Sequence, residues 1–339
     1  MKTLKLSALA LVAFLAFATT SCSDDDATPV QPAPADTSIT ALAVATPQLS
    51  TLVQALTKAG LTDTFKNPGT YTVFAPNNDA FSAFLTANNF ANLDAVPLPL
   101  LTEVLKNHVL TSRLASTALT TGYVKTLAKG AASTNTLSMF VNTANSKVIL
   151  NGGAEVKTPN IAASNGIIHI VDKVIGLPSI VDHAKANPLL SLLVKVVTST
   201  VTNGNGFGDQ SAVATALTTN TTPLTVFAPI DAAFVTATTA PGFATGATGA
   251  PVTKVLQYHV VAGNNLAASL QNDTELTTIA TNPADALLQK LRVFTNAPLG
   301  ARLQDKATAP NNISKIIATD IQCTNGVVHA IDKVLQPNL

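Results

Sequence analysis

Residues 165–175 read NGIIHIVDKVI, and residues 325–335 read NGVVHAIDKVL. Each segment opens with Asn-Gly, a dipeptide typical of tight turns. Each then continues as a run in which both alternating sets of side chains are largely apolar. A strand with two apolar faces is expected in the centre of a sheet, where both faces are covered. The sequence therefore predicts the same buried strand twice, at an offset of 325 − 165 = 160 residues.

Two further segments recur upstream, in the same order. Residues 72–81 (TVFAPNNDAF) match residues 225–234 (TVFAPIDAAF), and residues 105–110 (LKNHVL) match residues 256–261 (LQYHVV). Their offsets, 225 − 72 = 153 and 256 − 105 = 151, are close to that of the first pair. Three ordered blocks, duplicated at nearly constant spacing, indicate that a whole domain is repeated.

Each repeat is predicted to combine helices with strands. In repeat one, apolar residues at helical spacing predict a helix over residues 49–59 that Gly60 ends. Residues 72–74 are rich in strand-forming types and predict a short strand. Asn78 and its counterpart Asp231 are expected to cap the helix that follows that strand in each repeat.

The three blocks are similar to the conserved segments of the fasciclin family: its first box, its tyrosine–histidine motif and its second box. The resemblance covers nearly all of the chain after residue 36, and it occurs twice. It implies an α+β fold class, with two tandem fasciclin-like domains at residues 37–177 and 178–337, each a β-wedge of two packed sheets with flanking helices. It also implies adhesion or matrix interaction outside the cell.

The resemblance further suggests candidate interaction positions. At the tyrosine–histidine motif repeat two keeps the tyrosine, whereas repeat one has asparagine. If that position contributes to a binding surface, repeat one is expected to bind more weakly. The family's Asp-Ile step, linked with receptor contact in animal relatives, is present in repeat two, and repeat one has Asn160-Ile161 there. The candidate positions are Asn107, His108, Tyr258, His259, Asp320 and Ile321.

Residues 1–21 are predicted to be a lipoprotein signal peptide. Lys2 and Lys5 form a positive start, and residues 6–18 form an apolar stretch. Its 13 residues are too few for a membrane-spanning helix, which takes about 20, and this disfavours an uncleaved anchor helix. Cys22 follows small residues and resembles the lipobox cysteine of bacterial lipoproteins, so it is the predicted lipidation site. An ordinary secretory signal with an incidental cysteine is the alternative.

Residues 22–36 are expected to form a tether. Three consecutive aspartates, at 24–26, resemble the surface-export signal of Bacteroidetes lipoproteins, and residues 27–36 are rich in proline and alanine without an apolar periodicity. The sequence therefore predicts a protein attached to the membrane through an N-terminal lipid, on the cell outer membrane and exposed at the surface.

Composition restricts the possible partners. Charged residues make up 12% of the chain, against about 25% in typical domains, and the net charge is +1. Without a basic run, binding to nucleic acid is not expected. With Cys22 lipidated, Cys323 is the only other cysteine, which excludes a disulfide framework. No basic residue is near Cys323 in sequence, so it is expected to be a small buried apolar residue.

No catalytic, cofactor or metal site is expected. Four of the five histidines recur in pairs, which raises the alternative of a metal site in each domain. However, His108 and His169 are 61 residues apart, and His259 and His329 are 70 apart, with no cysteine partner, so histidines bonded to backbone or polar neighbours are expected. No G-x-S-x-G motif occurs, and residues 204–209 (GNGFGD) lack the last glycine of a dinucleotide-binding loop.

The sequence thus favours an adhesion or extracellular interaction protein, not an enzyme, whose tandem domains bind a protein or a glycan. Tandem weak sites gain affinity through effective concentration. The alternative is an envelope scaffold, or a lipoprotein that binds a soluble ligand or glycan in a concave pocket.

Overall fold

The computed structural model describes residues 36–200, 207–220, 222–237, 250–281, 287–295, 300–306 and 313–339. The predicted signal peptide, Cys22 and nearly all of the tether lie outside these residues, as does part of the segment 204–209. No helix in the described ranges is long and apolar enough to cross a membrane.

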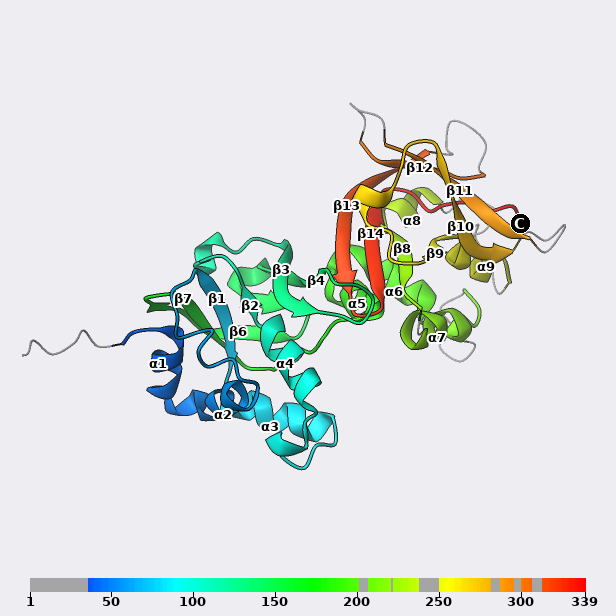
Figure 1. Ribbon diagram of the computed structural model, residues 1–339. Coiled ribbons are helices and arrows are strands. Elements are labelled where there is room, and N and C mark those ends of the chain that lie inside the picture. Colours follow the sequence, from blue (N-terminus) through cyan, green and yellow to red (C-terminus); the bar gives the residue numbers. More distant parts are fainter. Residues whose placement is uncertain are drawn as a thin grey trace, which may run out of the picture. The chain divides into compact units, whose positions relative to one another are not determined.

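Repeat one contains four α-helices and seven strands within the described residues (Figure 1). The helices are α1 (Ile39–Val44), α2 (Ser50–Lys58), α3 (Asn78–Ala87) and α4 (Leu98–Asn107), with short 3-10 turns η1 (Pro47–Leu49), η2 (Leu93–Ala95), η3 (Ser116–Ala118) and η4 (Ala144–Ser146). The strands are β1 (Tyr71–Pro76), β2 (Val109–Leu110), β3 (Gly122–Lys129), β4 (Thr136–Asn142), β5 (Ile149–Leu150), β6 (Ala154–Ala163) and β7 (Gly166–Val171).

Repeat two follows a similar order of elements, with one additional helix, α7, before its first strand. Its helices are α5 (Ile180–Ala186), α6 (Ser191–Val197), α7 (Ser211–Thr219), α8 (Asp231–Ala237) and α9 (Ala250–Tyr258), with 3-10 turns η5 (Pro188–Leu190) and η6 (Ala267–Ser269). Its strands are β8 (Leu224–Pro229), β9 (Val260–Ala262), β10 (Thr274–Thr281), β11 (Leu288–Phe294), β12 (Arg302–Gln304), β13 (Ile313–Cys323) and β14 (Gly326–Ile331).

The strand predicted to be central is central in both repeats. In repeat one the strands pair in the order β2-β1-β7-β6-β5-β4-β3, with β7 parallel to β1 and antiparallel to β6. Repeat two has the corresponding order, and an additional pairing of β9 with β10 closes its strands into a barrel. All six residues of β7 and all six of β14 are buried. The Asn-Gly turn and the buried strand are therefore confirmed.

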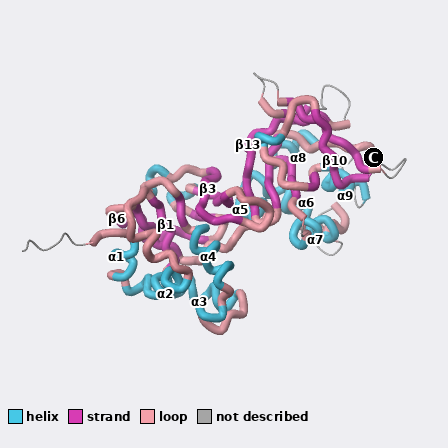
Figure 2. Tube along the Cα trace, in the orientation of Figure 1, coloured by secondary structure: helices cyan, strands magenta, loops and turns pink. Residues whose placement is uncertain are grey.

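Two apolar clusters fill repeat one, one on each face of β7. Ile168 and Ile170 pack among side chains of α2, α3 and α4. Val171 and Phe74 belong to the second cluster, with Met139 of β4 and side chains of the other strands. Figure 2 shows the strands of repeat one with the helices beside them. This arrangement matches the expected wedge of sheets with flanking helices, and the α+β fold class is confirmed.

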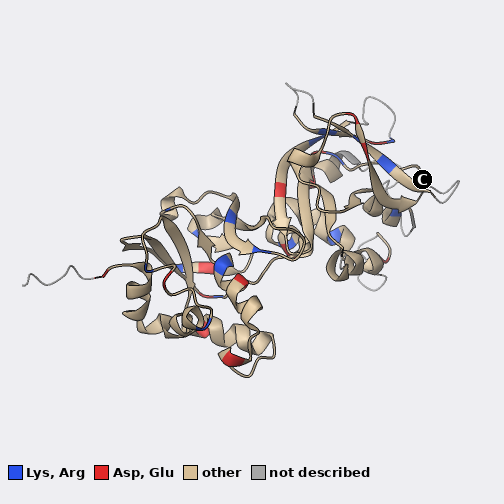
Figure 3. Cartoon of the chain, in the orientation of Figure 1, with Lys and Arg blue, Asp and Glu red and all other residues tan. Residues whose placement is uncertain are grey.

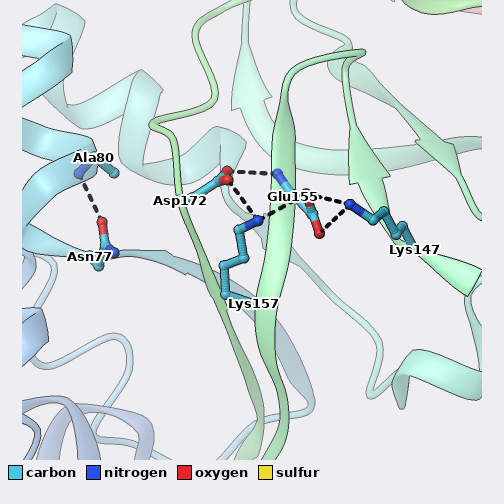
Figure 4. Close-up of polar contacts among 6 residues, drawn as sticks. All are labelled: Asn77, Ala80, Lys147, Glu155, Lys157 and Asp172. Atoms are coloured by element: carbon cyan, nitrogen blue, oxygen red, sulfur yellow. Dashed lines mark hydrogen bonds and ion pairs between the residues drawn. The ribbon is translucent and has the colours of Figure 1, made fainter.

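Local predictions for repeat one are largely correct. The helix expected over residues 49–59 is α2, and the strand expected over residues 72–74 is β1. The prediction that Asn78 and Asp231 cap their own helices is wrong, because they are the first residues of α3 and α8. The residue that caps α3 is Asn77, whose Oδ1 accepts a hydrogen bond from the backbone N–H of Ala80 at 2.8 Å (Figure 4).

Asn78 and Asp231 cap a different helix. Asn78 Oδ1 accepts from the N–H of Thr51 in α2 at 3.0 Å, and Asp231 Oδ1 accepts from the N–H of Leu192 in α6 at 2.8 Å. Both α2 and α6 begin after a leucine, whose side chain has no hydrogen-bond acceptor for the free backbone N–H groups at the start of a helix. The first box therefore supplies the missing cap from a distant part of the sequence.

Gly166 should not tolerate a side chain. A Cβ there would overlap the carbonyl oxygen of Tyr71 and lie 2.9 Å from Ile39 Cδ1, and Tyr71 pairs with Gly166 in the β1–β7 ladder. Because backbone would have to move, G166A is expected to lower the free energy of unfolding by about 3 kcal/mol, measured by denaturant unfolding. G153A is the control, since a Cβ at Gly153 meets no atom within 4 Å. Equal losses in the two variants would contradict the explanation.

Candidate functional site

The histidine of the tyrosine–histidine motif is a buried connection in both repeats. His108 Nδ1 lies 2.7 Å from the Val104 carbonyl oxygen, and its Nε2 accepts a hydrogen bond from the N–H of Ile175 at 2.8 Å. Because the carbonyl can only accept and the amide can only donate, the ring is neutral and carries its proton on Nδ1. It joins the end of α4 to the segment after β7.

His259 repeats this arrangement in the second domain. Its Nδ1 lies 2.7 Å from the Val255 carbonyl oxygen, and its Nε2 accepts from the N–H of Leu335 at 2.9 Å. Burial lowers the pKa of His108 and of His259 to about 4, since the charged ring is poorly solvated in the interior. Both rings are therefore structural hydrogen-bonding groups at neutral pH.

The histidine of the second box uses the opposite tautomer. His169 Nε2 lies 2.9 Å from the Leu114 carbonyl oxygen, and its Nδ1 accepts from the N–H of Asn160 at 3.2 Å. His329 does the same with the carbonyl oxygen of Asn265, at 2.8 Å, and a longer bond of 3.4 Å from the N–H of Asp320. Burial lowers the pKa of both rings. The prediction that these four histidines bond to backbone is confirmed.

The position before the motif histidine does not lie on a surface. Asn107 and Tyr258 are both fully buried, with no exposed area. Asn107 Nδ2 donates to the Gly176 carbonyl oxygen at 2.9 Å, and the Tyr258 hydroxyl donates to that of Lys290 at 2.8 Å. At this buried position each repeat thus has a different polar side chain that donates a hydrogen bond to a backbone carbonyl oxygen. The hypothesis that Asn107 makes repeat one a weaker binder therefore has no support, because neither side chain can reach a partner.

The Asp-Ile step is a bulge in the strand before the second box. Asp320 has a positive φ of 59°, as its counterpart Asn160 has with 66°, and the ladder changes register at both places. Asp320 Oδ1 accepts from the N–H of Ala267 at 2.8 Å. Ile321 is 2% exposed, so Asp320 is the only member of this pair that reaches the surface. Contact of Asp320 with a receptor stays a prediction.

Asn165 and Asn325 have a role that local sequence reasoning missed. Asn165 is 3% exposed; its Oδ1 accepts from the N–H of Ile39 at 3.0 Å, and its Nδ2 donates to the carbonyl oxygens of Phe65 and Asn67, both at 2.8 Å. Likewise, Asn325 Oδ1 accepts a hydrogen bond from the N–H of Ile180, and its Nδ2 donates one to the Leu217 carbonyl oxygen. The one available signal was that asparagine recurs at both positions.

The second-box aspartate closes the hairpin to the preceding strand. Asp172 Oδ1 accepts from the N–H of Glu155 at 2.8 Å, and Asp332 accepts in the same way from Lys315. In repeat one a chain of ion pairs extends this contact, as Figure 4 shows: Lys157 lies 3.3 Å from Asp172 and 2.9 Å from Glu155. Hydrogen bonds from Lys157 and Lys147 lower the carboxyl pKa of Glu155.

The described residues offer no constellation for metal binding. No group of three or more histidine, cysteine, aspartate or glutamate side chains is placed to hold an ion within them. Cys323 is fully buried, and burial raises the pKa of its thiol, which disfavours the reactive thiolate. Charged residues are sparse along both repeats (Figure 3).

Comparisons with known proteins agree with the repeated fold. The chain matches the fasciclin domain family twice, over residues 47–178 and 199–337. It is 33% identical over 126 residues to Protein sll1483 of Synechocystis, covering 37% of this chain and 66% of that protein. It is 25% identical over 278 residues to Fasciclin-1 of Schistocerca americana, covering 78% of this chain and 38% of that protein.

Among solved structures, one similar chain is a FAS1 domain pair from the insect cell adhesion molecule fasciclin I. The TM-score is 0.47 at 19% identity, with 85% of this chain and 96% of that chain covered. The family match includes well over half of the chain and falls on both repeats. The chain therefore belongs to the fasciclin domain family, with one such domain in each repeat.

Proposed function

We propose that this chain is a surface-anchored adhesion protein that binds an extracellular protein or glycan through its tandem domains. The observation that carries the proposal is the family match over both repeats. A solved pair of such domains belongs to a molecule described as an insect cell adhesion molecule, and Fasciclin-1 is among the relatives. Attachment to the membrane through a lipid on Cys22 completes the proposal, and it rests on the signal-like sequence before that residue.

The chemistry of the described residues supports binding over catalysis. The motif histidines, asparagines and Tyr258 are buried and hydrogen-bonded to backbone, so they stabilise the domains. A polar group whose hydrogen bonds are satisfied internally has little left to offer a substrate. Recognition is therefore expected at the outer surface of the domains, and charged residues make up only 12% of the chain (Figure 3).

The first test combines protease accessibility with attachment. Intact cells are treated with a protease that does not cross the outer membrane, and the protein is detected by blotting, with lysed cells as control. We expect loss of the protein on intact cells, and a severalfold reduction of surface attachment when the gene is deleted. Full protection on intact cells would place the domains inside the envelope and replace adhesion by a scaffold or ligand-binding role.

A further inference from the structure

A groove of about 400 Å³ lies on repeat one, where η3, the loop after β4 and strand β6 meet. Aliphatic side chains form part of its wall: Leu119, Val148 and Val156. We call it the repeat-one groove. Its volume is in the range of about 300–1,000 Å³ that is usual for small-molecule sites. A site of this size accommodates a ligand of a few rings.

Three residues with hydroxyl side chains, Ser116, Thr117 and Ser146, line the same groove. Ser116 Oγ accepts a hydrogen bond from Asn160 Nδ2 at 2.8 Å, which leaves its own O–H able to donate outward. The hydroxyls of Thr117 and Ser146 form no hydrogen bond within the part of the chain that the structure describes. Three hydroxyls are thus available to a ligand beside an aliphatic wall.

The charges of the groove cancel. Lys147 and Glu155 both line it, and they form an ion pair of 3.2 Å. The lysine side chain is 56% exposed and the glutamate 24%, so both remain accessible from the groove. The pair supplies additional donors and acceptors without a net charge that would attract an ionic ligand. The groove therefore fits a neutral, hydroxyl-rich molecule.

The backbone at the rim is held in an unfavourable conformation. Asn145 and Ser146 both have positive φ, 58° and 59°. Asparagine adopts this conformation readily, whereas for serine it costs on the order of 1 kcal/mol. Strained residues that persist in a fold are concentrated at binding and catalytic sites. Ser146 is also one of the residues that line the groove.

Repeat two lacks two of these hydroxyls at the equivalent places. Ser116 and Ala267 correspond, because the N–H of each donates to the side chain of the bulge residue before the last strand, at 2.8 Å in both repeats. The next residue is Thr117 in repeat one and Ala268 in repeat two. The shared fold therefore does not require hydroxyls here, and their presence in repeat one needs a separate explanation.

We propose that the repeat-one groove binds a neutral oligosaccharide of a few units. Sugar rings offer hydroxyls to Ser116, Thr117, Ser146 and the Lys147–Glu155 pair, and their C–H faces pack on the aliphatic wall. A peptide strand is a poorer occupant, since it needs an unpaired strand edge, and β6 is already paired with β5 at Glu155. This proposal rests on the proposed extracellular function, and it names the class of partner.

The test replaces the hydroxyl residues by those of repeat two. The full chain and its S116A/T117A variant are titrated calorimetrically with a panel of neutral oligosaccharides of two to six units. We expect saturable binding of at least one of them by the unchanged chain, and affinity at least tenfold weaker in the variant, which loses two hydrogen bonds. The variant should fold, because repeat two has alanine at both places.

The control variant is S82A/T111A, which removes two exposed hydroxyls of repeat one that do not line the groove. It should bind as the unchanged chain does. Equal affinity of the unchanged chain and S116A/T117A, or the absence of saturable binding to the whole panel, would overturn the proposal. Attachment that depends on the gene but not on these hydroxyls would leave adhesion standing without the groove. Binding in the groove without any effect of gene deletion on attachment would support the groove as a ligand site and contradict the adhesion function.

Discussion

Lowering the pH from 7 to 4.5 should reduce the free energy of unfolding by about 2 kcal/mol in repeat one and by about 4 to 5 kcal/mol in repeat two. Burial lowers the pKa of His108 in repeat one, and of His183 and His259 in repeat two, to about 4, against 6.5 in an unfolded chain. Each pKa unit corresponds to about 1.4 kcal/mol. Repeat two has two such residues, so it loses about twice as much.

The sign follows from where the proton binds. Between pH 6.5 and about 4 the unfolded chain takes up a proton on each of these histidines, whereas the folded chain does not. The stability is therefore fully present above pH 6.5, falls as the pH drops towards 4, and changes no further below the folded pKa. His169 and His329 shift in the same direction and add to the effect.

Urea unfolding at a series of pH values between 7 and 4.5 measures this loss. The range ends at 4.5 because Glu155 and Glu275, whose pKa values are lowered by neighbouring lysines, lose their contributions only below it. The H259Q variant is expected to be less stable at pH 7 but to have about half the pH dependence in repeat two. An unchanged pH dependence in H259Q would show that the buried ring is not responsible.

The strands and the duplication could be predicted from the sequence because their signals are local. Alternation over residues 165–175 places one set of side chains on each face, and the structure divides them accordingly, with Ile168 and Ile170 towards the helices and Val171 away from them. The helix over residues 49–59 was equally clear from its apolar spacing. Such patterns depend only on the geometry of a strand or a helix.

The polar contacts could not be predicted, because their partners are far apart in sequence. Asn78 is followed by Asp79 and Ala80 in the chain, yet its Oδ1 accepts a hydrogen bond from the N–H of Thr51, which lies 27 residues earlier. The motif positions Asn107 and Tyr258 are polar and suggested a surface, although a polar group can be buried when its hydrogen bonds are satisfied. Only the three-dimensional structure shows where those partners are.

The groove could not be predicted from the sequence either. Ser116, Ser146 and Glu155 come from three separate segments, and serine and threonine are too common in this chain for any of them to stand out. The useful comparison with Ala267 requires the structural alignment of the repeats, because the offset between them changes along the chain. The shared fold thus separates residues that both repeats have at one position from residues that only one repeat has.

Replacing Asn165 by alanine should lower the free energy of unfolding by about 4 kcal/mol. The variant leaves the N–H of Ile39 and two carbonyl oxygens without their buried partner, and each unsatisfied group costs about 1–3 kcal/mol. These bonds hold α1 and the segment before β1 against the start of β7, so their loss should loosen the N-terminal part of repeat one. Denaturant unfolding measures the change.

Two further variants serve as comparisons. N325A loses two hydrogen bonds and is expected to lower the free energy of unfolding by about 3 kcal/mol. The exposed N88A loses one hydrogen bond, to the Phe84 carbonyl oxygen, and should lower it by under about 1 kcal/mol. If N165A costs no more than N88A, then Asn165 serves only the turn, and any residue compatible with that turn would replace it.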